Sequence, residues 1–134
     1  MVFVMKADLT DAVPSPRSAE VACAALRVRV FRPGDGVVVV RVSGELDMSA
    51  SHFLTEFLRQ RLVGTSRMVV LDFSEISFIN SEGVSALLEA ERLAEARDKE
   101  LLLVPAPVVE RVLTLLGLAG RFTYAAEREL TTTG

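Results

Sequence analysis

Hydrophobic residues along this chain follow two different spacings. Short, continuous apolar runs at residues 68–71 and 101–104 are typical of strands buried on both faces. Residues 26–31 alternate at their start, and a second apolar run covers residues 37–42 after a turn rich in glycine. Two such runs joined by a short turn predict a β-hairpin. We expect this hairpin to form one edge of a sheet.

Three other stretches carry apolar residues at three- and four-residue spacing, which predicts helices with one buried face. The first helix follows Asp47, Ser49 and Ser51, which all offer capping oxygens, and it ends at Gly64. The other two helices are predicted at residues 80–97 and after Pro107.

A last short strand is predicted at residues 122–124, which completes the order β-β-α-β-α-β-α-β. Strands that alternate with helices pair in parallel through right-handed crossovers. The fold class is therefore α/β (α+β), a single domain with a mixed sheet of about five strands and flanking helices. We place this domain at residues 23–126, after a loosely ordered tail at residues 1–22 and before a polar tail at residues 127–134. Within the first tail, residues 2–4 either add an edge strand or dock on the domain.

Composition and charge narrow the classes of function. The chain has 134 residues, half of them apolar, which is enough for one core without disulfides. A net charge of -3 and a pI near 5.2 argue against direct nucleic-acid binding. No apolar run approaches the roughly 18 residues of a transmembrane helix, and residues 1–5 are too short for a signal peptide. We expect a cytoplasmic protein without membrane insertion.

Candidate catalytic and metal-binding residues are scarce. The single cysteine, Cys23, excludes an internal disulfide and a thiolate cluster, and the single histidine, His52, is expected on a polar helix face. We therefore expect no metal and no cofactor. Ser81 as a nucleophile would need a base, and its surroundings are not the G-x-S-x-G elbow. We expect that the protein is not an enzyme.

The start of the second helix, residues 80–83, is the stretch best suited to carry a function. Asn80 and Ser81 can both accept hydrogen bonds from unpaired amides of the first turn, and Glu82 lies favourably at the positive helix end. A serine in this position is most often only a cap, and Gly44 can likewise serve only to turn the chain. The residues themselves leave the cap and the functional site as alternatives.

Four segments, in order, resemble the STAS domain, and within it the bacterial anti-sigma factor antagonists. They are residues 39–47 (VVRVSGELD), 69–74 (VVLDFS), 78–84 (FINSEGV) and 102–113 (LLVPAPVVERVL). The likeness covers about residues 26–125. It implies a protein that binds an anti-sigma factor, itself a serine kinase, and thereby releases a sigma factor.

In that family the segment that corresponds to residues 80–83 normally reads Asp-Ser-Ser/Thr-Gly. The partner phosphorylates the serine after the Asp, and the phosphorylated antagonist then dissociates from the partner. Carried over to this sequence, Ser81 takes the phosphorylated position and Gly83 that of the glycine. Asn80 replaces the Asp and Glu82 replaces the second Ser or Thr. Asn80 keeps the capping geometry without the negative charge, and Glu82 adds a charge one residue from the acceptor oxygen.

The resemblance also implies a partner-binding surface on two neighbouring loops. Its residues are Glu45, Asp47, Ser49, Asn80, Ser81, Glu82 and Gly83. We expect a monomer or weak dimer. The altered motif keeps an alternative open, namely an accessory STAS subunit of a membrane transporter for lipids or anions, or a partner-binding STAS module that is not phosphorylated.

Overall fold

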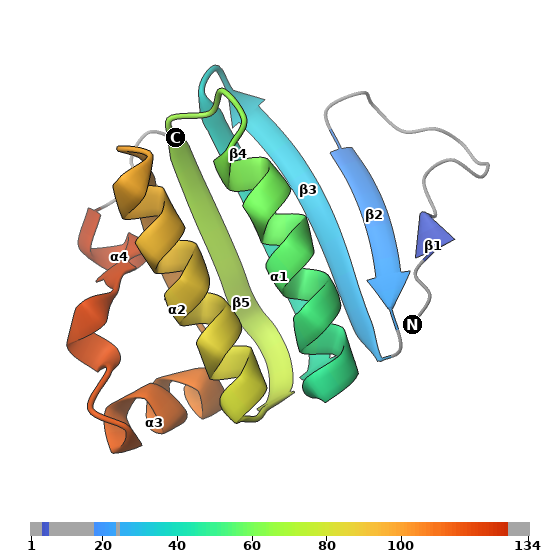
Figure 1. Ribbon diagram of the computed structural model, residues 1–134, viewed down its shortest axis with the longest axis vertical. Coiled ribbons are helices and arrows are strands. Elements are labelled where there is room, and N and C mark those ends of the chain that lie inside the picture. The colour runs from blue at the N-terminus through green and yellow to red at the C-terminus, as the bar shows by residue number, and fades with distance from the viewer. Residues whose placement is uncertain (1–3, 6–17, 24, 129–134) are drawn as a thin grey trace.

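Within the described residues, the strands of the sheet lie in the same order as in the sequence, from β1 to β7 (Figure 1). The computed structural model describes residues 4–5, 18–23 and 25–128. The strands are β1 (Val4–Met5), β2 (Ser18–Cys23), β3 (Leu26–Gly34), β4 (Val37–Leu46), β5 (Met68–Ile79), β6 (Glu100–Pro105) and β7 (Thr123–Tyr124). The helices are α1 (Met48–Leu62), α2 (Ser81–Ala96), α3 (Pro107–Leu115), the 3-10 turn η2 (Ala119–Arg121) and α4 (Ala125–Arg128).

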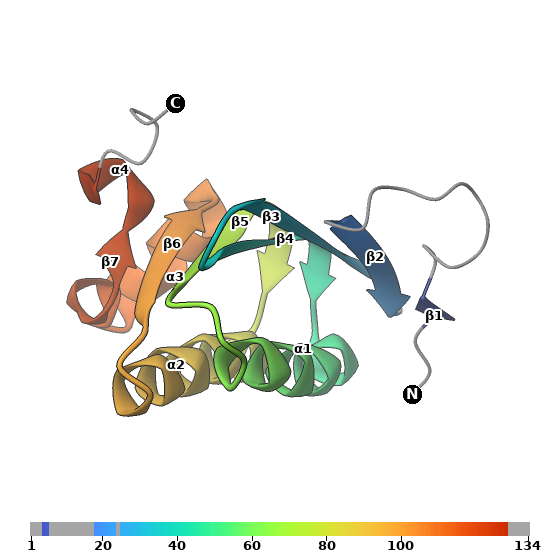
Figure 2. The same ribbon diagram turned by 90° about the horizontal axis from the view of Figure 1, so that it is seen from above.

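The pairing changes from antiparallel to parallel in the middle of the sheet. Strands β1 to β4 pair antiparallel, and β4 to β7 pair in parallel through the crossovers of α1, α2 and α3. Successive right-handed crossovers that step in one direction place their helices on one face. Figure 2 shows α1 and α2 together beneath the sheet, while α4 lies on the other side near β6.

The core fills the space between the sheet and the helices. Val40 of β4, Leu71 of β5 and Leu103 of β6 lie side by side in the register and are buried there, each at most 1% exposed. Leu54 and Leu58 of α1 and Leu87 of α2 cover them. The mixed α+β fold, the five predicted strands and the three predicted helices are thus confirmed.

The predicted hairpin β3–β4 does not form an edge of the sheet, because β2 pairs along the outer side of β3. Without a neighbour on its outer side, β3 would leave a row of backbone N–H and C=O groups unpaired, and β2 forms hydrogen bonds with these groups. Residues 18–22, assigned to the loosely ordered tail, therefore belong to the sheet. Residues 1–3, 6–17 and 129–134 of the two predicted tails lie outside the described residues.

Strand β5 is longer than its continuous apolar run. That run covers residues 68–71, whereas the strand continues to Ile79. Its pairing with β4 shifts twice, once between Arg41 and Ser43 and once between Gly44 and Glu45. At each shift β5 contains one residue more than β4, so the strand bulges and bends there.

Candidate functional site

The carboxyl ends of β4 and β5 bring the two predicted loops together. Glu45 lies opposite Phe78 in the parallel register, and Leu46 lies opposite Ile79. The amide of Asn80 donates to the carbonyl oxygen of Leu46 at 3.4 Å. Residues from both loops of the predicted partner-binding surface therefore meet at one end of the sheet.

Both helices that follow these strands begin with a side-chain cap. Asp47 accepts a hydrogen bond from the amide of Ala50 at 3.0 Å, and Asn80 accepts one from the amide of Gly83 at 3.0 Å. Ser49 is exposed, and its hydroxyl lies 3.5 Å from Asp47 Oδ1. Two capped helix starts thus lie at the same edge of the sheet, where their positive ends favour anionic groups.

The hydroxyl of Ser81 is not used by the fold. Ser81 is the first residue of α2 and is exposed, whereas Asn80 occupies the cap position and makes the capping hydrogen bond. Among the described residues, no group forms a hydrogen bond with the Ser81 side chain. The cap of α2 is therefore Asn80 and not Ser81.

Two glycines, Gly44 and Gly83, determine the backbone conformation and packing at this end of the sheet. Gly83 is buried, and a Cβ atom built on it would lie 2.7 Å from Ile79 Cγ1 and 2.9 Å from Leu46 Cδ2. Gly83 was predicted as part of the partner-binding surface. It is buried, and because it has no Cβ atom the start of α2 can pack closely against Ile79 and Leu46. Gly44 adopts φ +106°, a backbone conformation that strongly favours glycine.

Two large apolar side chains at this end of the molecule were missed by the sequence analysis. Met48, directly after the cap of α1, is 65% exposed, and Phe78, opposite Glu45, is 47% exposed. The second bulge of β5 turns Phe78 outward, although its apolar neighbours Ile76 and Ile79 are buried. The alternation of apolar and polar residues in the sequence does not predict that this bulge makes Phe78 exposed.

A groove of about 440 Å³ between α1 and α2 continues this surface. Met48 and His52 line it from α1, and Glu82 and Ser85 line it from α2. Glu45, which lies opposite Phe78 in the register, and Glu82, which lines the groove with Met48, are both exposed. The described residues hold no group of three His, Cys, Asp or Glu side chains that could bind a metal ion. This end of the molecule thus exposes the apolar side chains of Met48 and Phe78 together with the carboxylates of Glu45 and Glu82.

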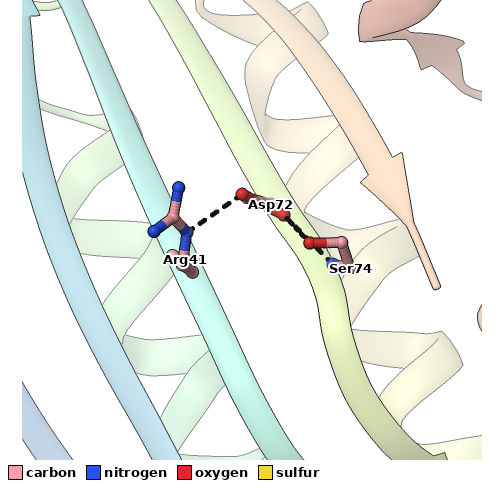
Figure 3. A network of polar contacts seen from close by, with 3 residues as sticks. All are labelled: Arg41, Asp72 and Ser74. Atoms are coloured by element: carbon pink, nitrogen blue, oxygen red, sulfur yellow. Dashed lines mark hydrogen bonds and ion pairs between the residues drawn. The ribbon is translucent and has the colours of Figure 1, made fainter.

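A polar network supports β5 at its first bulge (Figure 3). Asp72 accepts hydrogen bonds from Arg41 Nε at 3.0 Å and from the amide and hydroxyl of Ser74 at 3.1 Å and 2.6 Å. Burial by itself raises the pKa of Asp72, but the bonds from Ser74 and the charge of Arg41 outweigh it, so the pKa lies below its usual value. The ionised carboxylate satisfies the Ser74 amide at the irregular part of the strand.

Comparisons with known proteins place the chain in a family. The family model described as Mlab, STAS domain, matches residues 31–130. A relative named anti-sigma F factor antagonist, from Lysinibacillus sphaericus, is 31% identical over 98 residues, which cover 69% of this chain and 80% of the relative. No helix in the described part of the chain has the length and apolar character needed to cross a lipid bilayer.

Solved structures of similar proteins have the same fold. The anti-sigma factor antagonist SpoIIAA in its unphosphorylated form is 28% identical and has a TM-score of 0.63, with 76% of this chain and 90% of that chain covered. SpoIIAA of Bacillus in its phosphorylated form is 26% identical, has a TM-score of 0.61, and the match covers 79% and 97% of the two chains. An anti-sigma factor antagonist from Mycobacterium paratuberculosis is 25% identical with a TM-score of 0.66, and the match covers 81% and 92%.

Proposed function

Because this chain belongs to the STAS domain family, we propose that it is an anti-sigma factor antagonist switched by phosphorylation of Ser81. Its partner is an anti-sigma factor that is also a serine kinase, and binding of the unphosphorylated form releases the sigma factor. The observation that carries the proposal is the exposed Ser81 hydroxyl, which has no hydrogen-bond partner among the described residues while Asn80 caps the helix. A hydroxyl that the fold does not need is available to a kinase.

The surroundings of Ser81 suit a protein partner. Met48 and Phe78 offer apolar contacts, and large apolar side chains commonly anchor protein interfaces. The exposed Glu45 and Glu82 favour a partner surface that is basic at its rim. The partner that fits this surface therefore has an apolar pocket surrounded by Lys or Arg side chains, and it brings its kinase site to the first turn of α2.

Phosphorylation would change the charge of this surface more than its shape. A phosphate on Ser81 adds about -1.5 to -2 charges, and the amides at the start of α2 tolerate an anion there. Glu82 is the next residue, so two negative groups would face a partner surface shaped for a neutral serine. We expect this to cost roughly 1–3 kcal/mol of binding free energy, a loss of affinity of about tenfold to hundredfold.

The test measures phosphate incorporation and partner affinity with the cognate kinase. Ser81→Ala should bind like the wild type and take up no phosphate, whereas Ser85→Ala, one turn further along α2, should still be phosphorylated. Ser81→Glu should bind more weakly, and Thr65→Glu, an added charge between α1 and the amino end of β5, at the opposite end of the sheet, should not. Asn80→Asp should make Ser81 a better substrate. Equal affinities for the wild type, Ser81→Ala and Ser81→Glu would leave Ser81 without a switching role.

A second candidate is an accessory STAS subunit of a membrane transporter. The observation in its favour is the replacement of the usual acidic and hydroxyl residues by Asn80 and Glu82, because such a subunit needs no phosphorylation. Under this alternative the same surface binds a membrane-embedded subunit. Affinity for that subunit should then be the same for the wild type and for Ser81→Ala, and kinase treatment should leave Ser81 unmodified.

A further inference from the structure

The face of the sheet opposite α1 and α2 is covered over only part of its width. A row of apolar residues crosses this face in register, from Phe31 of β3 through Val39 and Val70 to Leu102 of β6. Val70 and Leu102 are buried, at 6% and 0% exposed, and α4 packs near β6 on this face. Phe31 and Val39 are partly exposed and do not belong to the core beneath the sheet. Figure 2 shows no described helix above β3 and β4, so the apolar row continues beyond its cover.

Two arginines lie beside the uncovered part of this row. Arg29 of β3 and Arg41 of β4 are opposite each other in the register, and the alternation of side chains puts them on the same face as Phe31 and Val39. The Cζ atom of Arg29 is 5.7 Å from the centroid of the Phe31 ring, and that of Arg41 is 5.1 Å from it. A guanidinium group is attracted to an aromatic ring at such distances. One ring therefore holds two positive groups at the surface.

The charge of the two arginines is only partly balanced within the described residues. Arg41 Nε donates to Asp72 Oδ2 at 3.0 Å, and its terminal amino groups point away from Asp72 (Figure 3). Arg29 forms no hydrogen bond or ion pair with a described residue. The Arg41 side chain is 35% exposed and Arg29 is also partly exposed, so a partner can reach both groups. A partner that covers Phe31 would therefore meet positive charge beside an apolar surface.

We infer that the sheet face over β3 and β4 binds an acidic amphipathic helix of a partner protein. Neighbouring strands lie about 4.8 Å apart and a helix with its side chains is about 10 Å wide, so two strands give room for one helix. The apolar side of the helix would cover Phe31 and Val39. Carboxylates at its flanks would accept paired hydrogen bonds from Arg29 and Arg41.

The same observations argue against a nucleic acid as the ligand. Proteins that bind single strands stack successive bases on exposed aromatic rings, whereas the Phe31 ring already carries both guanidinium groups. Phe31 is also the only aromatic residue of β3 and β4. A net charge of -3 gives no overall attraction for a polyanion. A helix with a few carboxylates needs only the local match of charge that Arg29 and Arg41 offer.

The test titrates the full chain with a fluorescent synthetic helix that carries Leu along one side and Glu on both flanks. The wild type should bind it, should bind the same helix with Gln for every Glu much more weakly, and should lose affinity as salt is added. Arg29→Gln and Arg41→Gln should each weaken binding about fivefold, the effect of one ion pair near the surface. The control Arg97→Gln, an exposed position at the end of α2, should bind like the wild type. Glu20→Gln, at the position of β2 opposite Arg29, should bind more tightly.

Backbone amide NMR shifts during the titration locate the site, because residues of β3 and β4 should move most. Melting temperatures check that each variant is folded, which matters for Arg41→Gln because Arg41 also bonds Asp72. Equal affinities for the wild type, Arg29→Gln and Arg97→Gln would overturn the inference, and so would a wild type that does not bind the acidic helix.

Two other occupants of this face give results of their own. If single-stranded DNA binds through Arg29 and the acidic helix does not, the ligand is a nucleic acid. If sedimentation shows a dimer that Arg29→Gln separates, a second copy of the chain covers the face. Either result would overturn the assignment to an acidic partner. The inference goes beyond the proposed function, and Ser81→Glu should bind the acidic helix like the wild type, so the two proposals stand or fail separately.

Discussion

Replacing Gly44 by alanine should strongly destabilise the fold. Gly44 has φ +106°, where an L-residue is strained, and a Cβ atom built on it would overlap the carbonyl oxygen of Ala25. That carbonyl accepts a hydrogen bond from the amide of Glu45 at 3.2 Å, so moving it aside also weakens this bond. The strain contributes about 1–3 kcal/mol and the lost bond about 1 kcal/mol.

The expected loss is therefore about 2–4 kcal/mol, a large part of the 5–15 kcal/mol that typically separates folded from unfolded domains. Urea unfolding measures it directly, and melting should fall by about 4 °C for each kcal/mol in a chain of this size. Gly34→Ala is the matched control, because its Cβ atom would have nothing within 4 Å and its φ is not positive. We expect Gly34→Ala to be neutral or to stabilise by about 0.4–1 kcal/mol.

The comparison decides whether the backbone conformation of Gly44 is enforced by the fold. If Gly44→Ala and Gly34→Ala had the same stability within about 0.5 kcal/mol, the usual scatter of a surface substitution, the reasoning from φ and from Ala25 would be refuted. The position matters for function, since Gly44 directly precedes Glu45 at the predicted partner surface.

Two further changes test the core and the polar network. Leu71 lies in the central strand and has no exposed surface, so Leu71→Ala should lower the free energy of unfolding in urea by about 2–5 kcal/mol. Leu115 is 76% exposed, and a similar loss for Leu115→Ala would argue against burial as the cause. Asp72 has a lowered pKa in the folded state, so its stabilising effect is present above the unfolded value of about 3.9 and is lost as the pH falls through the folded pKa. Asp72→Asn should therefore be less stable than the wild type at pH near 7 and nearly as stable in acid, and a gap in unfolding free energy that stayed constant with pH would contradict the assigned role.

Much of the fold could be predicted from hydrophobic spacing. The apolar runs at residues 68–71 and 101–104 lie in β5 and β6, where residues 69–71 pair with residues 101–103. The polar residues at helix starts were also informative, because Asp47 and Asn80 are the observed caps of α1 and α2. These signals are local, since a cap and a strand period involve neighbours in the chain.

The features that could not be predicted depend on contacts between distant segments. The two bulges of β5 arise from its register with β4, and they decide that Phe78 is exposed and that Ser81 follows the strand almost directly. Strand β2 forms because β3 offers it an unpaired side, although its own sequence has no strong apolar run.

The order of the strands has a consequence for how the chain acquires its structure. In the described part of the chain, strands that are neighbours in the sheet are also consecutive in the sequence, so no strand has to wait for a distant one. Pairings of this kind close short segments of chain and lose less entropy than distant pairings do. A chain leaving the ribosome can therefore add one strand after another to a growing sheet, beginning with its antiparallel N-terminal strands. We expect the predicted partner-binding surface to be complete once α2 has emerged, while β6, α3 and β7 are still inside the ribosome.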